Sequence, residues 1–560
     1  MTWIWMAALW ATTPDAEVVI GQKGHCLTVF QGHTVEPFDF VVRGVMQDFL
    51  GPGLPVVVVR LLGEKPEFTG VVAGMSGSPC FIGDRLIGAL GYSFAMFAKE
   101  PIAGITPIGP MRAVHELPEE KRNWRGAIAS RDNAFGSAQP IATPLTLVGV
   151  PGFVQEAFAP WFEARGLGPM AAGGSGTSPS STKETLVPGD AVAVKLIDGD
   201  VNVAATGTVT TVDGNRVLAF GHPFQSLGAA SLPMCKATIV NTMASAARSF
   251  KMSNPGAIVG EFVQDRLTAI AGILGSPPPM LEVQGTMHVK GELRKFRFSV
   301  ARDPELTPQL LAMGLASVMS GQLEMGSRGR VIMDAQLLFG SHAPVAIHTV
   351  HSAEGDGRLF LASAMDVSSR FTPLWQSQFG VPPQAKITVD ITVDVTPLLE
   401  EITSVHVAKS HLRVNERLQA EVTLRADQGP SRLFKIDVPI APSWKNKKLS
   451  LQVMDAKAVA AKDKDLGTSP EPQNFEDILE KARHVYPTGK IYVRVVAEDA
   501  PGARVGDLQL GGVPPTAVVA LGTGLGASVM KQQILWSDII DAPGAVVGKT
   551  ETHFWVARAR

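Results

Sequence analysis

Short apolar runs separated by glycine and proline follow one another through most of the chain. Between residues 17 and 115 they include FDFVVRGV, LPVVVVRLL and RLIGALGY. Runs of this kind, rich in β-branched residues and bounded by turn residues, are typical of a compact antiparallel barrel or sandwich. We therefore predict a first β-barrel over residues 17–115.

The same pattern returns between residues 184 and 302, where the runs include AVAVKLI, VNVAATGTVTTV and RVLAFGHPF. A turn signal at Asp213-Gly214 separates two of them, so a second β-barrel is predicted over residues 184–302. In residues 116–183 the pattern loosens, and the segment AAGGSGTSPSST is too polar to bury a core. We interpret residues 116–183 as a linker with a low-complexity stretch.

The second half of the chain is predicted to form accessory domains. Residues 303–397 combine one amphipathic helix, PELTPQLLAMGLASVMSG, with strands. Residues 398–455 alternate polar and apolar positions with regular turns, as an immunoglobulin-like sandwich does. Residues 456–560 mix a helix at NFEDILEKARH with further strands and form a C-terminal α+β region. The expected fold class is mainly β, with two barrel units followed by accessory β-sandwich domains and a few helices.

Composition narrows the classes of partner. The 50 basic and 52 acidic residues give a net charge of -2 without a long run of either sign, so nothing favours nucleic acid or an anionic membrane. No window after the N-terminus offers the roughly 20 uninterrupted apolar residues of a spanning helix, and no integral membrane segment is predicted.

The first 16 residues contain an apolar run followed by small and polar residues. This resembles the end of a secretory signal, although the basic n-region is missing, and a disordered start is the alternative. We predict a secreted, periplasmic or cell-envelope protein on this basis.

The three cysteines, Cys26, Cys80 and Cys235, are far apart in the sequence and lie in apolar, strand-like contexts. A zinc site requires closely spaced pairs of ligands, so we predict no metal and no other cofactor. The cysteines are interpreted as small core residues.

The strongest chemical signal is Gly74-Met75-Ser76-Gly77-Ser78-Pro79. A nucleophilic serine needs a sharp turn that exposes its hydroxyl, and the flanking glycines permit such a turn. The same turn can aim the amides of Gly74 and Ser76 at one point, which would form an oxyanion hole. Ser76 is therefore the candidate nucleophile, and a purely structural Gly-Ser-Pro turn is the alternative.

The residues after the turn, CFIGDRLIGAL, form a predicted hairpin. This resembles the trypsin-like peptidases, in which a GDSGGP turn precedes a similar hairpin. Met75 replaces their aspartate, so activation by a new amino terminus is not expected. The stretch TGVVAGMSGSPCFIGDRLIGAL resembles instead the SpoIVB-type serine peptidase family. The resemblance implies two trypsin-like barrel units and cleavage of a protein or peptide substrate.

His222 is the candidate base, since histidine titrates near neutrality. It ends the apolar strand of ATGTVTTVDGNRVLAFGHPF, and SpoIVB-type peptidases carry a similar GTxT strand leading to a catalytic Gly-His. In that family the histidine precedes the serine, whereas here Ser76 comes first, so the resemblance implies a permuted order of the two barrels with the site between them. His25 and His33 are the main competitors, and a structural role for His222 is the alternative.

The acid of the triad has several candidates. The family carries an aspartate shortly before its serine, but the corresponding stretch RLLGEKPEFTGVVAG offers only Glu64 and Glu67, of which we assign Glu67. A serine-histidine dyad is also compatible with the sequence. Three further carboxylates belong to the His222 domain, namely Asp190, Asp200 and Asp265.

Three functions compete at this stage. The first is a serine endopeptidase acting through an acyl-enzyme. The second is a catalytically inactive peptidase-fold protein of the envelope, or a scaffold, that binds protein partners through its β domains. An esterase is disfavoured because a strand, and not the helix of a nucleophile elbow, follows Ser76. Sporulation is not carried over, because a fold does not fix a pathway.

Overall fold

The computed structural model describes residues 18–557, with the exception of residues 96, 119–138, 173–184, 321–328, 354–357, 381–383, 395, 397, 428, 464–471, 498–501, 506–507, 512, 515, 517–527 and 531. The predicted signal segment lies outside the described residues. The chain forms two compact units, the first comprising residues 1–282 and 297–318 and the second residues 283–296 and 319–560.

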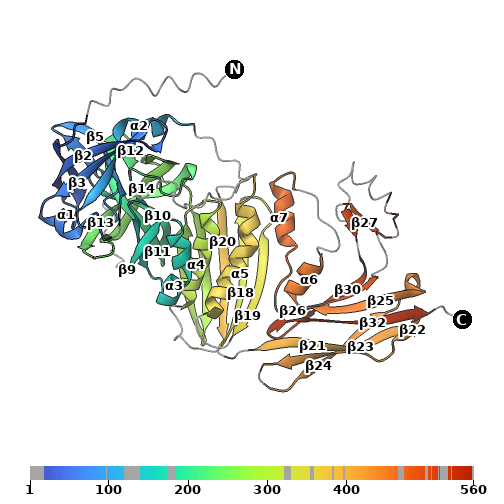
Figure 1. Ribbon diagram of the computed structural model, residues 1–560. Helices are drawn as coiled ribbons and strands as arrows, with labels where there is room; N and C mark the ends of the chain where they lie inside the picture. The colour runs from blue at the N-terminus through green and yellow to red at the C-terminus, as the bar shows by residue number, and fades with distance from the viewer. Residues whose placement is uncertain are drawn as a thin grey trace. The chain divides into compact units, whose positions relative to one another are not determined.

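The first unit begins with a closed antiparallel barrel, drawn in blue in Figure 1. Its strands pair in the circuit β1-β2-β3-β6-β5-β4, and β4 closes the circuit on β1. The short helix α1 (Glu64–Thr69) follows β3 and leads to the predicted serine turn. The six strands are β1 (Lys23–Val29), β2 (Val35–Gly51), β3 (Leu54–Leu62), β4 (Pro79–Ile82), β5 (Arg85–Ser93) and β6 (Ile102–Pro107).

A second six-stranded antiparallel barrel follows in the same unit, with the circuit β10-β11-β12-β15-β14-β13 closed on β10. Strands β10, β11, β12 and β15 are buried along runs of consecutive residues, so both faces of these strands are covered. The six strands are β10 (Ala191–Gly199), β11 (Asn202–Asp213), β12 (Arg216–Ala219), β13 (Gly228–Met243), β14 (Phe250–Arg266) and β15 (Ala269–Leu274). Both predicted barrels are therefore present.

The predicted linker needs a correction between residues 139 and 172. Here the chain forms β7 (Gln139–Pro140), β8 (Thr143–Val148), α3 (Gly152–Glu163) and β9 (Leu167–Ala172), and β8 pairs with β11 of the second barrel. The apolar side chains of α3 explain this, because Val154, Phe158 and Phe162 are buried. Most of the low-complexity stretch lies outside the described residues.

Two short helical segments, α2 (Ile108–Arg112) and η1 (Ala113–Glu116), follow the first barrel. The hairpin β16 (Leu281–Val289) and β17 (Glu292–Val300) belongs partly to each unit, and β17 pairs with β10. The predicted helix after it is α4 (Leu306–Ser320). The helix is present as predicted, but its residues are buried on nearly all sides, so it is a core helix and not an amphipathic one.

In the second unit, β18 (Gly329–Phe339) lies between β19 (Val345–Ala353) and β20 (Ala385–Asp394). Helix α5 (Arg358–Trp375) buries one face, including Leu359, Val367 and Phe371. A β-sandwich follows, in which sheets β24-β23-β21-β31 and β22-β32-β25-β26-β30 share one apolar core running from Ile402 to Val556. The sandwich thus continues past the predicted boundary at residue 455.

The sandwich and the segments between its strands contain the remaining described helices and strands of the chain. They are β21 (Leu399–Val407), β22 (His411–Arg413), β23 (Arg417–Ala426), β24 (Arg432–Pro439), η2 (Pro442–Trp444), β25 (Lys447–Met454), α6 (Ala456–Asp463), α7 (Phe475–Arg483), β26 (Lys490–Ala497), β27 (Gly502–Val505), β28 (Leu508–Gly511), β29 (Ser528–Met530), β30 (Gln533–Asp541), β31 (Ala545–Val547) and β32 (Lys549–Ala557).

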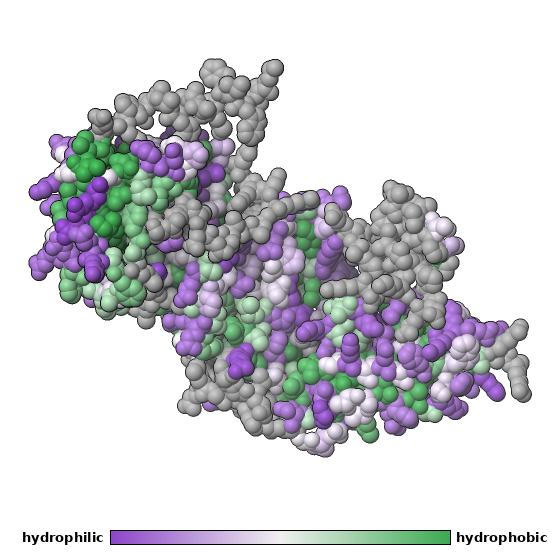
Figure 2. Space-filling view, in the orientation of Figure 1, coloured by the Kyte–Doolittle hydropathy of each residue, from purple (hydrophilic) through white to green (hydrophobic). Residues whose placement is uncertain are grey.

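The predicted fold class is confirmed: the chain is mainly β, with two barrels followed by sandwich sheets and a few helices. Among the described residues, no helix has both the length and the apolarity needed to cross a membrane. Figure 2 shows apolar residues in green at the surface of the first barrel, near the labels β2 and β3 of Figure 1, and exposed Val45 and Met46 lie on β2.

Candidate active site

The serine turn is held in a conformation that only glycine adopts easily. Gly74 and Gly77 both have φ of 96°. A Cβ at Gly77 would lie 2.0 Å from the carbonyl oxygen of Thr208 and 2.4 Å from the amide nitrogen of Phe220, so no side chain fits there. Met75, which replaces the trypsin-like aspartate, is fully buried in the core of the first barrel and anchors the turn.

Some backbone amides of the serine turn donate hydrogen bonds and others do not. The amides of Met75, Gly77 and Ser78 donate to carbonyl oxygens, at 3.0, 2.7 and 3.0 Å respectively. Within the described part of the chain, the amides of Gly74 and Ser76 donate to no acceptor. These are the two amides predicted to form the oxyanion hole, and they are open as such a role requires.

The hydroxyls of the two serines in the turn also differ in whether they form a hydrogen bond. The hydroxyl of Ser78 donates to the carbonyl oxygen of Met75 at 2.7 Å and so braces the turn. Ser76 is 0% exposed, and its hydroxyl has no hydrogen-bond partner among the described residues. A buried hydroxyl without a partner costs about 1–3 kcal/mol, which calls for an explanation beyond packing.

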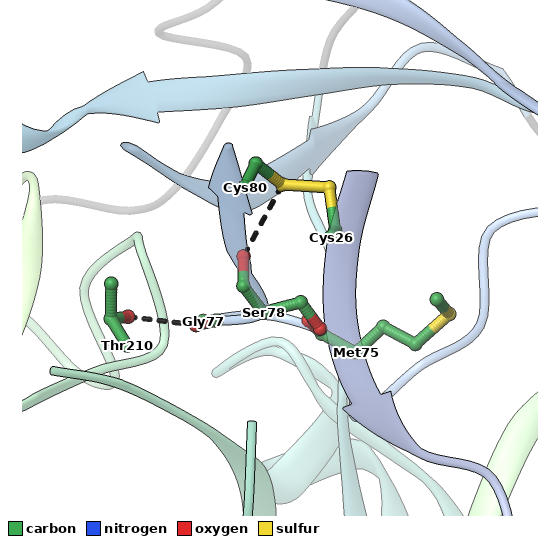
Figure 3. Close-up of a disulfide and its surroundings, with 6 residues drawn as sticks. All are labelled: Cys26, Met75, Gly77, Ser78, Cys80 and Thr210. Atoms are coloured by element: carbon green, nitrogen blue, oxygen red, sulfur yellow. Dashed lines mark hydrogen bonds between the residues drawn. A yellow bond between two sulfur atoms is a disulfide. The ribbon is translucent and has the colours of Figure 1, made fainter. Parts of the chain in front are cut away.

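The GTVT strand predicted to accompany the histidine binds directly to the serine turn. Thr208 donates from its amide to the carbonyl of Ser76 at 2.8 Å and from its hydroxyl to the carbonyl of Gly74 at 2.9 Å. Thr210 donates to the carbonyl of Gly77 at 2.7 Å (Figure 3). Two motifs that were singled out separately in the sequence therefore form one structure.

His222 lies after a strained turn at the end of β12. Phe220 has φ of 70° and Gly221 has φ of 64°, and a bulky residue rarely adopts the first of these values. Strain of this kind persists where the surrounding structure enforces it, and it is concentrated at functional sites. The ring of Phe220 meets the ring of His222 edge to face, with the centroids 6.0 Å apart.

The hydrogen bond of the imidazole selects its tautomer. His222 is 2% exposed, and its Nδ1 lies 2.8 Å from the carbonyl oxygen of Pro223. Because a carbonyl oxygen only accepts, Nδ1 carries the proton and donates it. In the neutral ring Nε2 then has the lone pair that a general base needs.

The carbonyl of Leu90 joins the segments of the two candidate residues. It accepts from the amide of Gly77 at 2.7 Å, and it lies 2.9 Å from the position of a Cβ on Gly221. Thr106 of the first barrel also donates to the carbonyl of Gly221 at 2.5 Å. Gly77, which follows Ser76, and Gly221, which precedes His222, therefore both pack on the backbone of Leu90.

The assigned acid, Glu67, lies on α1 with a half-exposed side chain 3.8 Å from Arg60. No described contact joins it to His222. Glu64 lies at the start of the same helix. Asp190 pairs with Lys236 at 2.9 Å, and Asp200 accepts from the amide of Arg297 at 2.7 Å.

Asp265 is the candidate carboxylate that shapes the histidine segment. It is 1% exposed and accepts from the amides of Phe224, Gln225 and Leu227 at 2.7, 2.7 and 3.0 Å. Charge-assisted bonds of this number hold a loop firmly. Among the carboxylates left open by the sequence, Asp265 therefore has a positioning role through the backbone that follows His222.

The competing histidines lie elsewhere. The ring of His25 stacks on Phe81, with the centroids 5.4 Å apart, and Nε2 of His33 lies 3.2 Å from the hydroxyl of Thr238. Across the described ranges, no group of three or more histidine, cysteine or acidic side chains is arranged to hold a metal.

All three cysteines are core residues, as interpreted, but the pairing of two of them was not predicted from the sequence. Cys26 and Cys80 form a disulfide between β1 and β4 (Figure 3). Cys235 is a buried thiol that donates to the carbonyl oxygen of Ala193 at 3.6 Å. The sequence separation of 54 between the partners gave no cue, because only closure of the barrel places them opposite each other. The Sγ of Cys80 lies 3.4 Å from the carbonyl oxygen of Ser78, which is a contact and not a hydrogen bond since a disulfide sulfur carries no proton.

Lys251 is a residue near the turn that sequence reasoning missed. It is 1% exposed on β14, and burial lowers its pKa to about 7. Lys251 and Ser253 are buried and alternate with partly buried neighbours in FKMSN, and this period of two was the available signal.

Comparisons of the chain with family models, with curated proteins and with solved structures find no match.

Proposed function

We propose that the chain is a serine endopeptidase that acts on protein or peptide substrates. The hydroxyl oxygen of Ser76 attacks the peptide carbonyl carbon while Nε2 of His222 accepts the hydroxyl proton. The amides of Gly74 and Ser76 bind the oxyanion. His222 then gives the proton to the leaving amine as the C–N bond breaks, and water releases the acyl group by the same steps in reverse.

The observation that carries the proposal is the set of hydrogen bonds from Thr208 and Thr210 to the carbonyls of the serine turn. The resemblance to SpoIVB-type peptidases paired these two motifs, and this pairing is expected if they form one site. A strand, β4, follows the serine, which supports a peptidase of this type over an α/β-hydrolase esterase. The order of serine and histidine is permuted relative to that family.

The Cys26–Cys80 disulfide supports a secreted or envelope location, because such bonds persist in oxidising compartments. Protein partners in the envelope would then meet the β domains of the second unit.

The test is labelling by a fluorophosphonate probe. Wild-type protein is expected to be labelled on Ser76, and Ser76→Ala is expected to abolish labelling. Two matched controls should keep it: Ser78→Ala, in the same turn, and Ser450→Ala, another buried serine whose hydroxyl has no partner among the described residues. Labelling that survives Ser76→Ala would contradict the assignment.

A second function is favoured by one observation. Ser76 and His222 are 0% and 2% exposed, which suits a peptidase fold that binds partners without catalysis. This scaffold function predicts that folded wild-type protein is not labelled at any pH between 5 and 9, whereas the peptidase proposal predicts labelling within that interval.

A further inference from the structure

Lys251 is buried without a counter-ion among the residues that the structure describes. Its Nζ donates to the hydroxyl of Thr28 at 2.7 Å, and no other polar contact of this side chain is found within the described residues. A buried ammonium bound to one neutral hydroxyl is costly, because little replaces its hydration. Lysines in such positions are rare, and they occur at sites where the charge has a use.

Lys251 is joined to the segment that leads into the serine turn. Its amide donates to the carbonyl of Ala73 at 3.0 Å, and the amide of Ala73 donates to the carbonyl of Ser249 at 2.8 Å. The Cδ of Lys251 lies 3.3 Å from the position of a Cβ on Gly74, so its stem covers this glycine. Nζ is two bonds beyond Cδ, which places it within about 6 Å of the same position.

Few charged side chains belong to the elements around the Lys251 ammonium. Burial is the cause of the lowered pKa of Lys251, and no neighbouring charge offsets it. Residues 73–79 and β8 carry no ionisable side chain, and Glu36, opposite Thr28, pairs with Lys65. The other ionisable groups on β1, α1, β13 and β14, or directly before β14, are Lys23, His25, Glu64, Glu67, Lys236, Arg248, Glu261, Asp265 and Arg266.

We propose that Lys251 is a positioning residue of the oxyanion site, whose stem fixes Gly74 and whose ammonium adds positive potential behind the Gly74 amide. The inference rests on the proposed peptidase function and adds a second ionisable group to it. A unit charge at about 7 Å from an oxyanion, at the effective dielectric of a protein, corresponds to roughly fiftyfold in rate.

The proposal predicts a particular pH profile for the labelling rate. On the acid side the rate rises with pH, because a histidine acts as a base only in its neutral form. On the alkaline side it falls as Lys251, whose pKa is about 7, loses its charge. The fall is the signature of the lysine, since the serine and its base alone give no decline near neutrality.

The experiment measures the second-order rate of fluorophosphonate labelling from pH 5 to 9. Lys251→Arg stays charged and is expected to label without the alkaline fall. Lys251→Met is expected to label about ten- to fiftyfold more slowly at pH 6, also without the fall. Lys195→Met is the matched control, because Lys195 is a buried lysine of the same barrel that pairs with Asp198, and it should keep the wild-type profile.

Thr28→Val keeps the proposal testable if the Lys251 variants do not fold. Loss of the accepting hydroxyl disfavours the charged lysine, so the alkaline fall should move to lower pH. This inference is overturned if the labelling rate of wild type does not fall at alkaline pH, or if the fall is unchanged in Lys251→Met or in Thr28→Val. Each of these results leaves the peptidase proposal intact. Absence of any labelling of wild-type Ser76 overturns the peptidase proposal, and this inference with it.

Discussion

The barrel pair of the first unit and the sandwich of the second unit bury different kinds of side chain. The core of the sandwich is aliphatic and aromatic, with members such as Leu424, Leu451 and Val493. The junction of the two barrels buries hydroxyls, an imidazole, an ammonium and a carboxylate. These residues are Ser76, Ser78, Thr106, Thr206, Thr208, Thr210, His222, Lys251, Ser253 and Asp265.

The two kinds of buried side chain contribute to stability in different ways. An apolar core stabilises a fold by burial alone, whereas buried polar groups stabilise it only where each finds a partner. At the barrel junction the threonine hydroxyls find partners in backbone carbonyls of the serine turn. An unpaired hydroxyl is not diagnostic by itself, because Ser450 of the sandwich also has none. Ser76 differs by having two open amides beside it.

The largest expected effect comes from Gly77→Ala. The new Cβ would meet the backbone of Thr208 and Phe220, which cannot move without breaking the junction, and alanine resists the positive φ. We expect a loss of about 4 kcal/mol or failure of the barrel pair to fold. The matched change Gly429→Ala, at φ of 103° with open space around it, should cost only about 1 kcal/mol.

Hydrogen exchange measured by mass spectrometry checks this prediction. In Gly77→Ala, peptides from β4 and β5 should lose protection while peptides from β25 keep it. Equal loss in both regions would mean that the junction is not the site of the damage.

The next effect concerns the disulfide. Cys26→Ser with Cys80→Ser removes a cross-link that closes a loop with a sequence separation of 54 residues. Chain-entropy arguments predict a loss of about 4 kcal/mol, and measured losses for native disulfides are typically about 2–5 kcal/mol. The loss should appear in urea unfolding of the first barrel, and the exchange of β25 should not change.

Reduction of the wild-type protein tests the same bond without mutation. It should slow labelling of Ser76, because β4 begins two residues after Gly77 and the bond holds β4 against β1. Unchanged labelling of fully reduced protein would show that the turn is held by Thr208 and Thr210 alone.

The sequence predicted the parts of the molecule whose signals are local. Alternating runs give the two barrels, and glycines at fixed spacing give the serine turn, because these patterns reflect backbone conformation. The predicted linker failed where α3 buries Phe158 and Phe162, since a loosened pattern was interpreted as absence of structure.

Features that depend on pairing of distant strands were not predictable. The disulfide requires Cys26 to face Cys80 across β1 and β4, and only the closed barrel sets this register. The position of Lys251 beside the serine turn also depends on such pairing, because it is set by the hydrogen bonds between β14 and Ala73. The acid also could not be chosen from the sequence, because Asp190, Asp200 and Asp265 are equivalent there and differ only in what their carboxylates bind.

The smallest expected effect links the pH dependence of stability to that of the site. The pKa of Lys251 is about 7 in the folded chain and about 10.4 when unfolded, so between these values the unfolded state binds the extra proton. Stability therefore rises with pH in this window, by at most about 1.4 kcal/mol per pH unit, and the penalty is largest below pH 7. Urea unfolding of wild type at pH 7 and pH 9, compared with Lys251→Met, isolates this contribution.

Lys251→Met should lose the part of the rise of stability with pH that Lys251 causes, while Lys195→Met should keep it. Labelling of Ser76 is expected to change in the opposite direction over the same window, falling as stability rises, because the charge that destabilises the fold is the one that assists the oxyanion site. A slope shared by wild type and Lys251→Met would show that Lys251 is already neutral below pH 7. The junction would then owe its polar character to the threonines and His222 alone, and the contrast with the sandwich would be one of hydrogen bonding without charge.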